Sequence, residues 1–222
     1  MPTDVFVPQV VFTFGPVEIT TTVLYSLVVS GLLVAFALLA RASLAGRSSG
    51  WGIVAELVVE HLEEVMSDML GRSPRPYTPL VVTLALFIGV ANLIGLVPGL
   101  SSPTGDISTT AALAIIVFFA VPFYGIRARG LRGYLRRYIE PTPILLPLEI
   151  ISEFSRTLAL AVRLFGNVMS GGMIISVLLL LAGLLVPVPI MMLSVITGLV
   201  QAYIFAVLTV VYMSAAIRTH EN

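Results

Sequence analysis

One arginine of this 222-residue chain lies in the middle of a long apolar stretch. Arg163 follows Leu158–Val162 and precedes Leu164 and Phe165. A guanidinium at the centre of a lipid bilayer costs about 2.5–3.5 kcal/mol on insertion scales. Arginine cannot avoid this cost by losing its proton, because it stays charged at every physiological pH. A permanent positive charge in such a segment is typical of an ion or substrate pathway.

Polar residues before and after Arg163 share its side of the predicted helix. They are Glu149, Glu153, Arg156 and Asn167. At about 100° per residue, the five positions fall within an arc of roughly 80°. Part of this polar stripe has a purely structural explanation, which is an ion pair between Glu153 and Arg156. No acidic residue occurs from position 155 to 217, however. We therefore expect the partner charge of Arg163 on another helix or another subunit.

The composition is that of an integral membrane protein. Apolar residues make up 58% of the chain, charged residues make up 11%, and the mean hydropathy is +1.04. The formal net charge is zero, so nothing indicates a nucleic-acid partner. The absence of cysteine excludes disulfide bonds and cysteine-based metal or redox chemistry. The first sixteen residues carry no positive charge, so we expect an anchor rather than a cleaved signal peptide.

Five apolar segments are long enough to cross a bilayer as helices. We expect spans over residues 20–43, 79–98 and 109–127. The last two segments, 144–185 and 190–217, are longer than a perpendicular crossing requires. Because a short proline-containing turn joins them, we expect a steeply tilted helical hairpin.

Between the first two spans, residues 51–70 combine apolar positions at helical spacing with five acidic residues. This pattern is typical of an amphipathic helix at a membrane surface. His61 lies beside Glu60 and near Glu64, but no second histidine or cysteine is nearby, so we expect a solvated face and no metal. The sequence thus predicts an all-α integral membrane fold, with one membrane domain over residues 1–222.

The arginines are unevenly distributed between the loops. They follow the first, third and fifth predicted spans and precede the second, whereas residues 1–18 and 99–108 have none. By the positive-inside rule, the N-terminus lies outside and the C-terminus lies in the cytoplasm. We expect the chain in the cytoplasmic (inner) membrane of a bacterium or archaeon.

The last apolar segment has its own polar face, formed by Ser194, Thr197 and Gln201. If the hairpin packs, this face can meet Arg163, and an amide in lipid needs a partner. We therefore expect Gln201 to hydrogen-bond the guanidinium. For Ser194 and Thr197, the alternative is a hydrogen bond to a carbonyl of their own helix.

The stretch Arg163-Leu-Phe-Gly-Asn167 resembles the core motif of the a subunit of F-type ATP synthases. Further stretches that resemble this family are Asn92–Pro98, Pro103–Asp106 with Thr109, Gln201–Tyr212, and Glu149 at a matching acidic position. Together these motifs are highly specific, and the resemblance covers about residues 79–216.

The resemblance implies a stator subunit with no catalytic residue, cofactor or metal of its own. Its partners would be a ring of c subunits, b-type stator subunits, the rest of the ATP synthase and the lipid bilayer. A membrane carboxylate of the c ring would face Arg163. The arginine would separate two ion half-channels and couple the flow of H⁺ or Na⁺ to rotation of the ring. Rotation would in turn drive ATP synthesis, or ATP hydrolysis would drive pumping.

The resemblance also implies which side chains line the ion path. The expected residues are Arg163, Gln201, Asn167, Glu149, Glu153, Asn92 and Ser194. Many family members have titratable groups at the positions of Gly172 and Ser194, and neither residue here can relay a proton. Either the outer path is a water-filled cleft that Ser170 also lines, or the ion is Na⁺. We keep H⁺ as the first expectation.

Two other classes of protein compete with this interpretation. A self-contained small transporter with Arg163 as an anionic-substrate site predicts an inverted repeat and a counter-ion site, and the sequence has neither. An intramembrane enzyme needs a nucleophile and base, or a metal set, within the membrane. The two histidines, His61 and His220, both lie near predicted surfaces.

Overall fold

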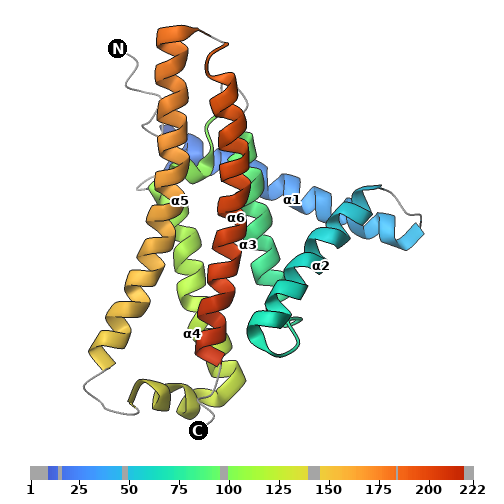
Figure 1. Cartoon of the computed structure of the whole chain (residues 1–222), viewed down its shortest axis with the longest axis vertical. Coiled ribbons are helices and arrows are strands. Elements are labelled where there is room, and N and C mark those ends of the chain that lie inside the picture. Colours follow the sequence, from blue (N-terminus) through green and yellow to red (C-terminus); the bar gives the residue numbers. More distant parts are fainter. Residues whose placement is uncertain are drawn as a thin grey trace.

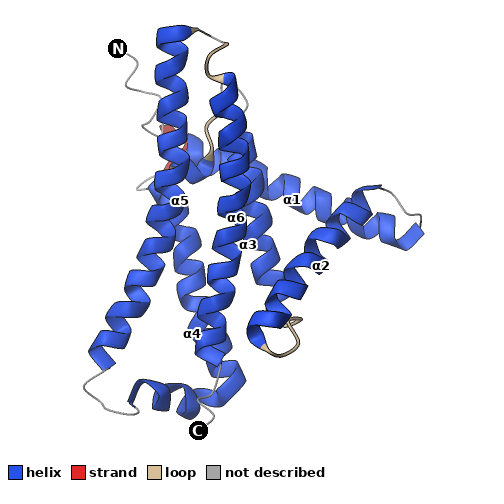
Figure 2. Cartoon of the chain, viewed as in Figure 1, coloured by secondary structure: helices blue, strands red, loops and turns tan. Residues whose placement is uncertain are grey.

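The computed structural model describes residues 10–14, 17–46, 50–95, 100–139, 146–183 and 185–217 of the chain. Within these ranges the protein is almost entirely helical (Figure 1 and Figure 2). The α-helices are α1 (Thr21–Gly46), α2 (Gly50–Leu70), α3 (Thr78–Ile94), α4 (Ile107–Ile139), α5 (Leu146–Ala182) and α6 (Val188–Ile217). The predicted all-α membrane class is confirmed.

Two small elements accompany the helices. An antiparallel hairpin of β1 (Val10–Phe14) and β2 (Val17–Thr20) precedes α1. A 3₁₀ turn, η2 (Pro103–Gly105), precedes α4. The sequence analysis did not predict the hairpin, because alternation over four or five residues is a weak signal beside a long apolar run.

Four of the described helices are long enough to cross a bilayer, and α5 is much longer than a crossing requires. Helices α1, α4, α5 and α6 each contain an apolar stretch long enough to span a membrane. With 17 residues, α3 reaches the lower end of the usual range of about 17–25. The 37 residues of α5 make a helix about 55 Å long, against a hydrocarbon core of about 30 Å. Helices α5 and α6 run side by side, and α5 leans away from α6 toward its N-terminal end (Figure 1).

The core lies between α3, α4, α5 and α6, with α6 at its centre. Helix α6 contacts each of the other three and also α2. Its side chains Phe205 and Met213 are fully buried, as is Leu164 of α5. Helix α2 packs one face, with Leu62, Met66 and Leu70, into this core and leaves most of its acidic residues exposed. That division is the one expected of an amphipathic helix.

Helix α1 differs from the others because it runs across the direction of α3 to α6 (Figure 1). Only 11% of its apolar span is buried, against 33% for the span in α4. Most of its apolar surface is therefore left uncovered by the described part of the chain.

The arginine-rich segment at the end of α4 is anchored beneath the bundle (Figure 1). The helix changes direction at Gly130, whose φ of 74° is one that residues with a side chain rarely adopt. The ring of Tyr134 then folds back onto Gly125, where a Cβ would lie 2.7 Å from the ring atom Cε2. Arg129 Nε donates to the carbonyl of Ile217 at 2.8 Å and so satisfies a carbonyl at the end of α6.

A hydrogen-bond network fastens the opposite end of the bundle. Thr104 of η2 is fully buried, and its hydroxyl donates to Asn92 Oδ1. Asn92 Nδ2 donates to the carbonyl of Gly198 at 2.8 Å. Ser102 Oγ donates to the carbonyl of Ala91 at 2.8 Å and lies 2.7 Å from Thr104 Oγ1. The network therefore joins η2 to α3 and α6.

Thr104→Val tests this network, because valine keeps the shape of threonine and removes its hydroxyl. Asn92 Oδ1 then loses its buried donor, so we expect the free energy of unfolding to fall by about 1–3 kcal/mol. Thermal denaturation of the purified protein measures the change. Thr109→Val is the matched control, because the Thr109 side chain makes no hydrogen bond within the described residues. Equal melting temperatures for the two variants would show that the network does not stabilise the fold.

Candidate functional site

Arg163 lies on an exposed flank of α5. Leu160, Ala161 and Leu164 of the same helix face the core. Arg163 is about 100° around the helix from Leu164, at the edge of the buried face. Within the described ranges, no residue forms a hydrogen bond, ion pair or ring contact with its guanidinium. The described helices therefore supply no counter-charge to Arg163.

The surface of α5 around Arg163 is made of small or apolar residues. Ala159, Val162, Gly166 and Ser170 are all exposed. A Cβ added at Gly166 would meet no atom within 4 Å, so the space in front of it is open. Ser170 directs its hydroxyl to the carbonyl of Asn167 at 3.1 Å. The guanidinium thus stands beside a surface on which another helix can pack closely.

The expected hydrogen bond between Gln201 and Arg163 is absent from the structure. Gln201 is only 6% exposed and lies on the buried face of α6 with Gly198 and Phe205. Arg163 lies on the exposed flank of α5, and within the described residues no hydrogen bond joins the two side chains. A role for Gln201 in ion translocation stays a prediction.

Ser194 and Gly172, where the resemblance implies titratable groups, have different surroundings. Ser194 is half-buried, and a Cβ on Gly171 would lie 3.3 Å from its Oγ. Gly172 has open space in front of it, with no atom within 4 Å of an added Cβ. Thr197 donates to the carbonyl of Leu193 at 2.7 Å, which is the alternative expected for this hydroxyl.

The two asparagines predicted to line the ion path also differ. Asn167 is half-buried one turn beyond Arg163 on α5. Both ends of the Asn92 side chain are used within the fold, since its amide nitrogen donates to Gly198 and its oxygen accepts from Thr104. Asn92 therefore holds helices together, whether or not an ion passes near it.

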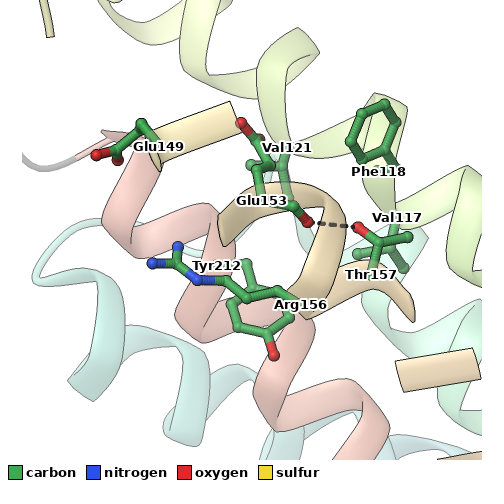
Figure 3. A pocket seen from close by; sticks show the side chains of 8 residues that line it. All are labelled: Val117, Phe118, Val121, Glu149, Glu153, Arg156, Thr157 and Tyr212. Atoms are coloured by element: carbon green, nitrogen blue, oxygen red, sulfur yellow. Dashed lines mark hydrogen bonds between the residues drawn. The ribbon is translucent and has the colours of Figure 1, made fainter. Parts of the chain in front are cut away.

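A pocket opens between α4, α5 and α6, toward the arginine-rich end of the bundle (Figure 3). Its lining residues are Val117, Phe118, Val121, Glu149, Glu153, Arg156, Thr157 and Tyr212. Glu149 and Glu153, which the sequence places one turn apart on one face, both reach this pocket and are half-buried. Thr157 donates its hydroxyl to the backbone carbonyl of Glu153 at 3.1 Å.

Arg156 has a contact that sequence spacing does not indicate. Its guanidinium carbon lies 5.9 Å from the centroid of the Tyr212 ring, a cation–π contact. Glu149 and Glu153 line the same pocket, and each of them has an interaction partner. The sequence analysis placed Arg156 on the polar stripe but did not predict the pocket or the part of Tyr212 in it. Only the packing of α6 against α5 brings that ring to Arg156.

His61 takes part in a packing contact between helices. Its ring stacks on Tyr203 of α6 with 6.0 Å between the centroids. Among the described residues, no cluster of histidine, cysteine or carboxylate side chains could hold a metal ion.

Comparison with known proteins identifies the family. The family model described as ATP synthase A chain matches residues 23–214. ATP synthase subunit a 2 of Picosynechococcus sp. is 48% identical, over 93% of this chain and 89% of the relative. The protein of the same name from Bradyrhizobium sp. is 47% identical, over 93% and 92%. ATP synthase subunit a 1 of Chlorobaculum parvum is 51% identical, over 78% and 77%. The chain therefore belongs to the ATP synthase A chain family.

Proposed function

We propose that this chain is the membrane stator subunit that lets ions pass between itself and a rotating ring of c subunits. The observation that carries this proposal is the exposed guanidinium of Arg163, which receives no counter-charge from the described residues. A charge in apolar surroundings is stable only when a partner compensates its desolvation. A membrane carboxylate on each c subunit is the complementary partner.

The surface around Arg163 supports this partner. Ala159, Gly166 and Ser170 leave room for a second helix to approach closely, as small residues do between membrane helices. A carboxylate that reaches Arg163 is held in its ionised form by the opposite charge, so it must first release its ion. A carboxylate that has bound an ion is neutral and can turn away into lipid. The exchange at Arg163 therefore ties ion transfer to rotation.

Arg163 also stands as a barrier between two aqueous half-channels. An ion that crosses a potential of 100 mV gains about 2.3 kcal/mol per charge, and a direct leak would dissipate it. We assign the inner half-channel to the pocket with Glu149 and Glu153, whose carboxylates attract cations. We assign the outer half-channel to the region of Asn167 and Ser194, with Gln201 near it. It is a solvated cleft, since neither Gly172 nor Ser194 can carry a proton.

The orientation follows from the arginine distribution. The arginine-rich end of the bundle lies in the cytoplasm together with the C-terminus, and the N-terminus lies outside. The membrane is the cytoplasmic (inner) membrane of a bacterium or archaeon. The chain performs no catalysis, and it assembles with the c ring, b-type stator subunits and the rest of the ATP synthase.

Arg163→Ala tests the central assignment. We expect ATP-driven ion pumping by the assembled complex to fall at least about 100-fold, because removing one electrostatic contact of this kind costs several kcal/mol. The amount of complex should be largely unchanged, since Arg163 makes no hydrogen bond, ion pair or ring contact within the described residues. Arg132→Gln is the control, because Arg132 is exposed at the arginine-rich end, outside the pocket. Coupled pumping in Arg163→Ala membranes would refute the assignment.

Glu149→Gln tests the inner half-channel. Removal of one carboxylate from the pocket should lower the local cation concentration and slow pumping about three- to tenfold. The rate of ATP-driven pumping per assembled complex gives the measurement. Glu64→Gln removes the same charge from an exposed position of α2 outside the pocket. If both variants pumped at the same rate, the pocket would not lie on the ion path.

A further inference from the structure

The outer side of the bundle, in the orientation proposed above, has few groups that can bind a cation. Helices α5 and α6 carry no acidic residue after Glu153, and α3 carries none. Of the twelve acidic residues of the chain, only Asp4, Glu18 and Asp106 lie in the outer segments of the sequence. Among these three, only the side chain of Asp106 lies within the described part of the structure.

Asp106 joins η2 to the first turn of α4 and is half-buried. Its Oδ1 accepts a hydrogen bond from the backbone N–H of Ser108 at 2.9 Å, so the side chain caps the helix. Within the described residues, the carboxylate makes no other hydrogen bond and no ion pair. One carboxylate oxygen and the negative charge are therefore not used by the described fold.

The turn that carries Asp106 packs directly on α5. A Cβ added at Gly105 would lie 3.7 Å from Val168 Cγ1. Val168 follows Arg163 by five residues, about 7.5 Å along the helix axis toward the outer end. Gly172 lies one turn further on the same face and has open space in front of it, with no atom within 4 Å of an added Cβ. Asp106 thus belongs to the turn beside the region assigned to the outer half-channel.

The elements packed against this turn are α1, α3, α4 and α5. Helix α3 has no ionisable residue, α4 has none before Tyr124, and α5 has none after Arg163. Helix α1 contributes Tyr25 and Arg41. None of these groups pairs with Asp106 within the described ranges. An unpaired carboxylate among apolar helices raises the local concentration of cations.

We propose that Asp106 collects the transported cation at the outer half-channel. Its carboxylate binds H⁺ or Na⁺ from the outer side and releases it toward the ring carboxylate at Arg163, so Asp106 returns to its charged form after each transfer. The inference rests on the proposed function, because it assumes that an ion passes between α5 and the ring. It goes beyond that function in naming an ionisable group on the outer side, where Gly172 and Ser194 supply none.

Asp106→Asn tests the proposal, because asparagine caps a helix about as well as aspartate but has no charge. The assembled complex is reconstituted in vesicles whose interior corresponds to the outer side. Initial rates of ATP synthesis are measured against interior sodium at fixed pH, and against interior pH at fixed sodium. The series that saturates in the unmodified complex identifies the cation. In that series, Asp106→Asn should raise the half-saturating cation concentration about three- to tenfold.

Further variants separate the charge of Asp106 from its capping role. Asp106→Glu keeps the charge and should leave the half-saturating concentration near its original value. If Asp106 only caps α4, the asparagine variant would behave like the unmodified complex, and the proposal would be overturned. Asp68→Asn is the matched control, since it makes the same change at an exposed position of α2. An equal shift in this control would also overturn the proposal.

Failure of the proposed function gives a different result. If Arg163→Ala retains coupled pumping, the stator function itself is wrong. If Arg163→Ala abolishes pumping while Asp106→Asn leaves the half-saturating concentration unchanged, only the role of Asp106 is wrong.

Discussion

The guanidinium of Arg163 lies on an apolar helix that offers it no counter-charge, and this constraint governs the architecture around it. Arginine cannot become neutral, so the cost of its burial in a membrane has to be offset by an opposite charge. The described helices do not provide that charge. Leu160 and Leu164 anchor one side of α5 in the core, which leaves the side with Arg163 free for another chain. Under the proposed function, this uncompensated side of α5 is the surface that another subunit completes.

The remaining contacts make α3, α4 and α6 a firm support for this helix. At one end, Asn92 and Thr104 tie η2 to α3 and α6. At the other end, Arg129 donates a hydrogen bond to the last carbonyl of α6, that of Ile217, and Tyr134 packs on Gly125. Thr104 and Tyr134 are buried and Asn92 and Arg129 are half-buried, and loss of these hydrogen bonds would leave donors or acceptors unsatisfied. Arg163 is exposed, and Asn167, Ser194, Glu149 and Glu153 are half-buried, whereas Gln201 is buried.

Much of the fold follows from the sequence because an apolar run of membrane length has few alternatives to a helix. Most helices begin and end within a few residues of the predicted limits, but α4 continues to Ile139, beyond the predicted end at residue 127. The turn of α4 at Gly130 was not predicted, because the run of helix-compatible residues continues past it. The spacing of the polar residues predicts that Glu149 and Glu153 share one face of the helix, and both residues line the same pocket. The predicted hydrogen bond between Gln201 and Arg163 is absent from the described structure. The cation–π contact between Arg156 and Tyr212 was not predicted. Both contacts depend on how α6 is rotated about its axis relative to α5. The periodicity of a single helix gives no information on that rotation.

The central claim is that a second chain neutralises Arg163, and a structure of the assembled complex in a membrane tests it most directly. The measurement is the distance from the Arg163 guanidinium to each surrounding carboxylate. Our account predicts that the nearest one belongs to a ring subunit and faces the surface formed by Ala159, Gly166 and Ser170. If the nearest carboxylate were Glu153 of the same chain, or if lipid alone surrounded the guanidinium, the account would be contradicted.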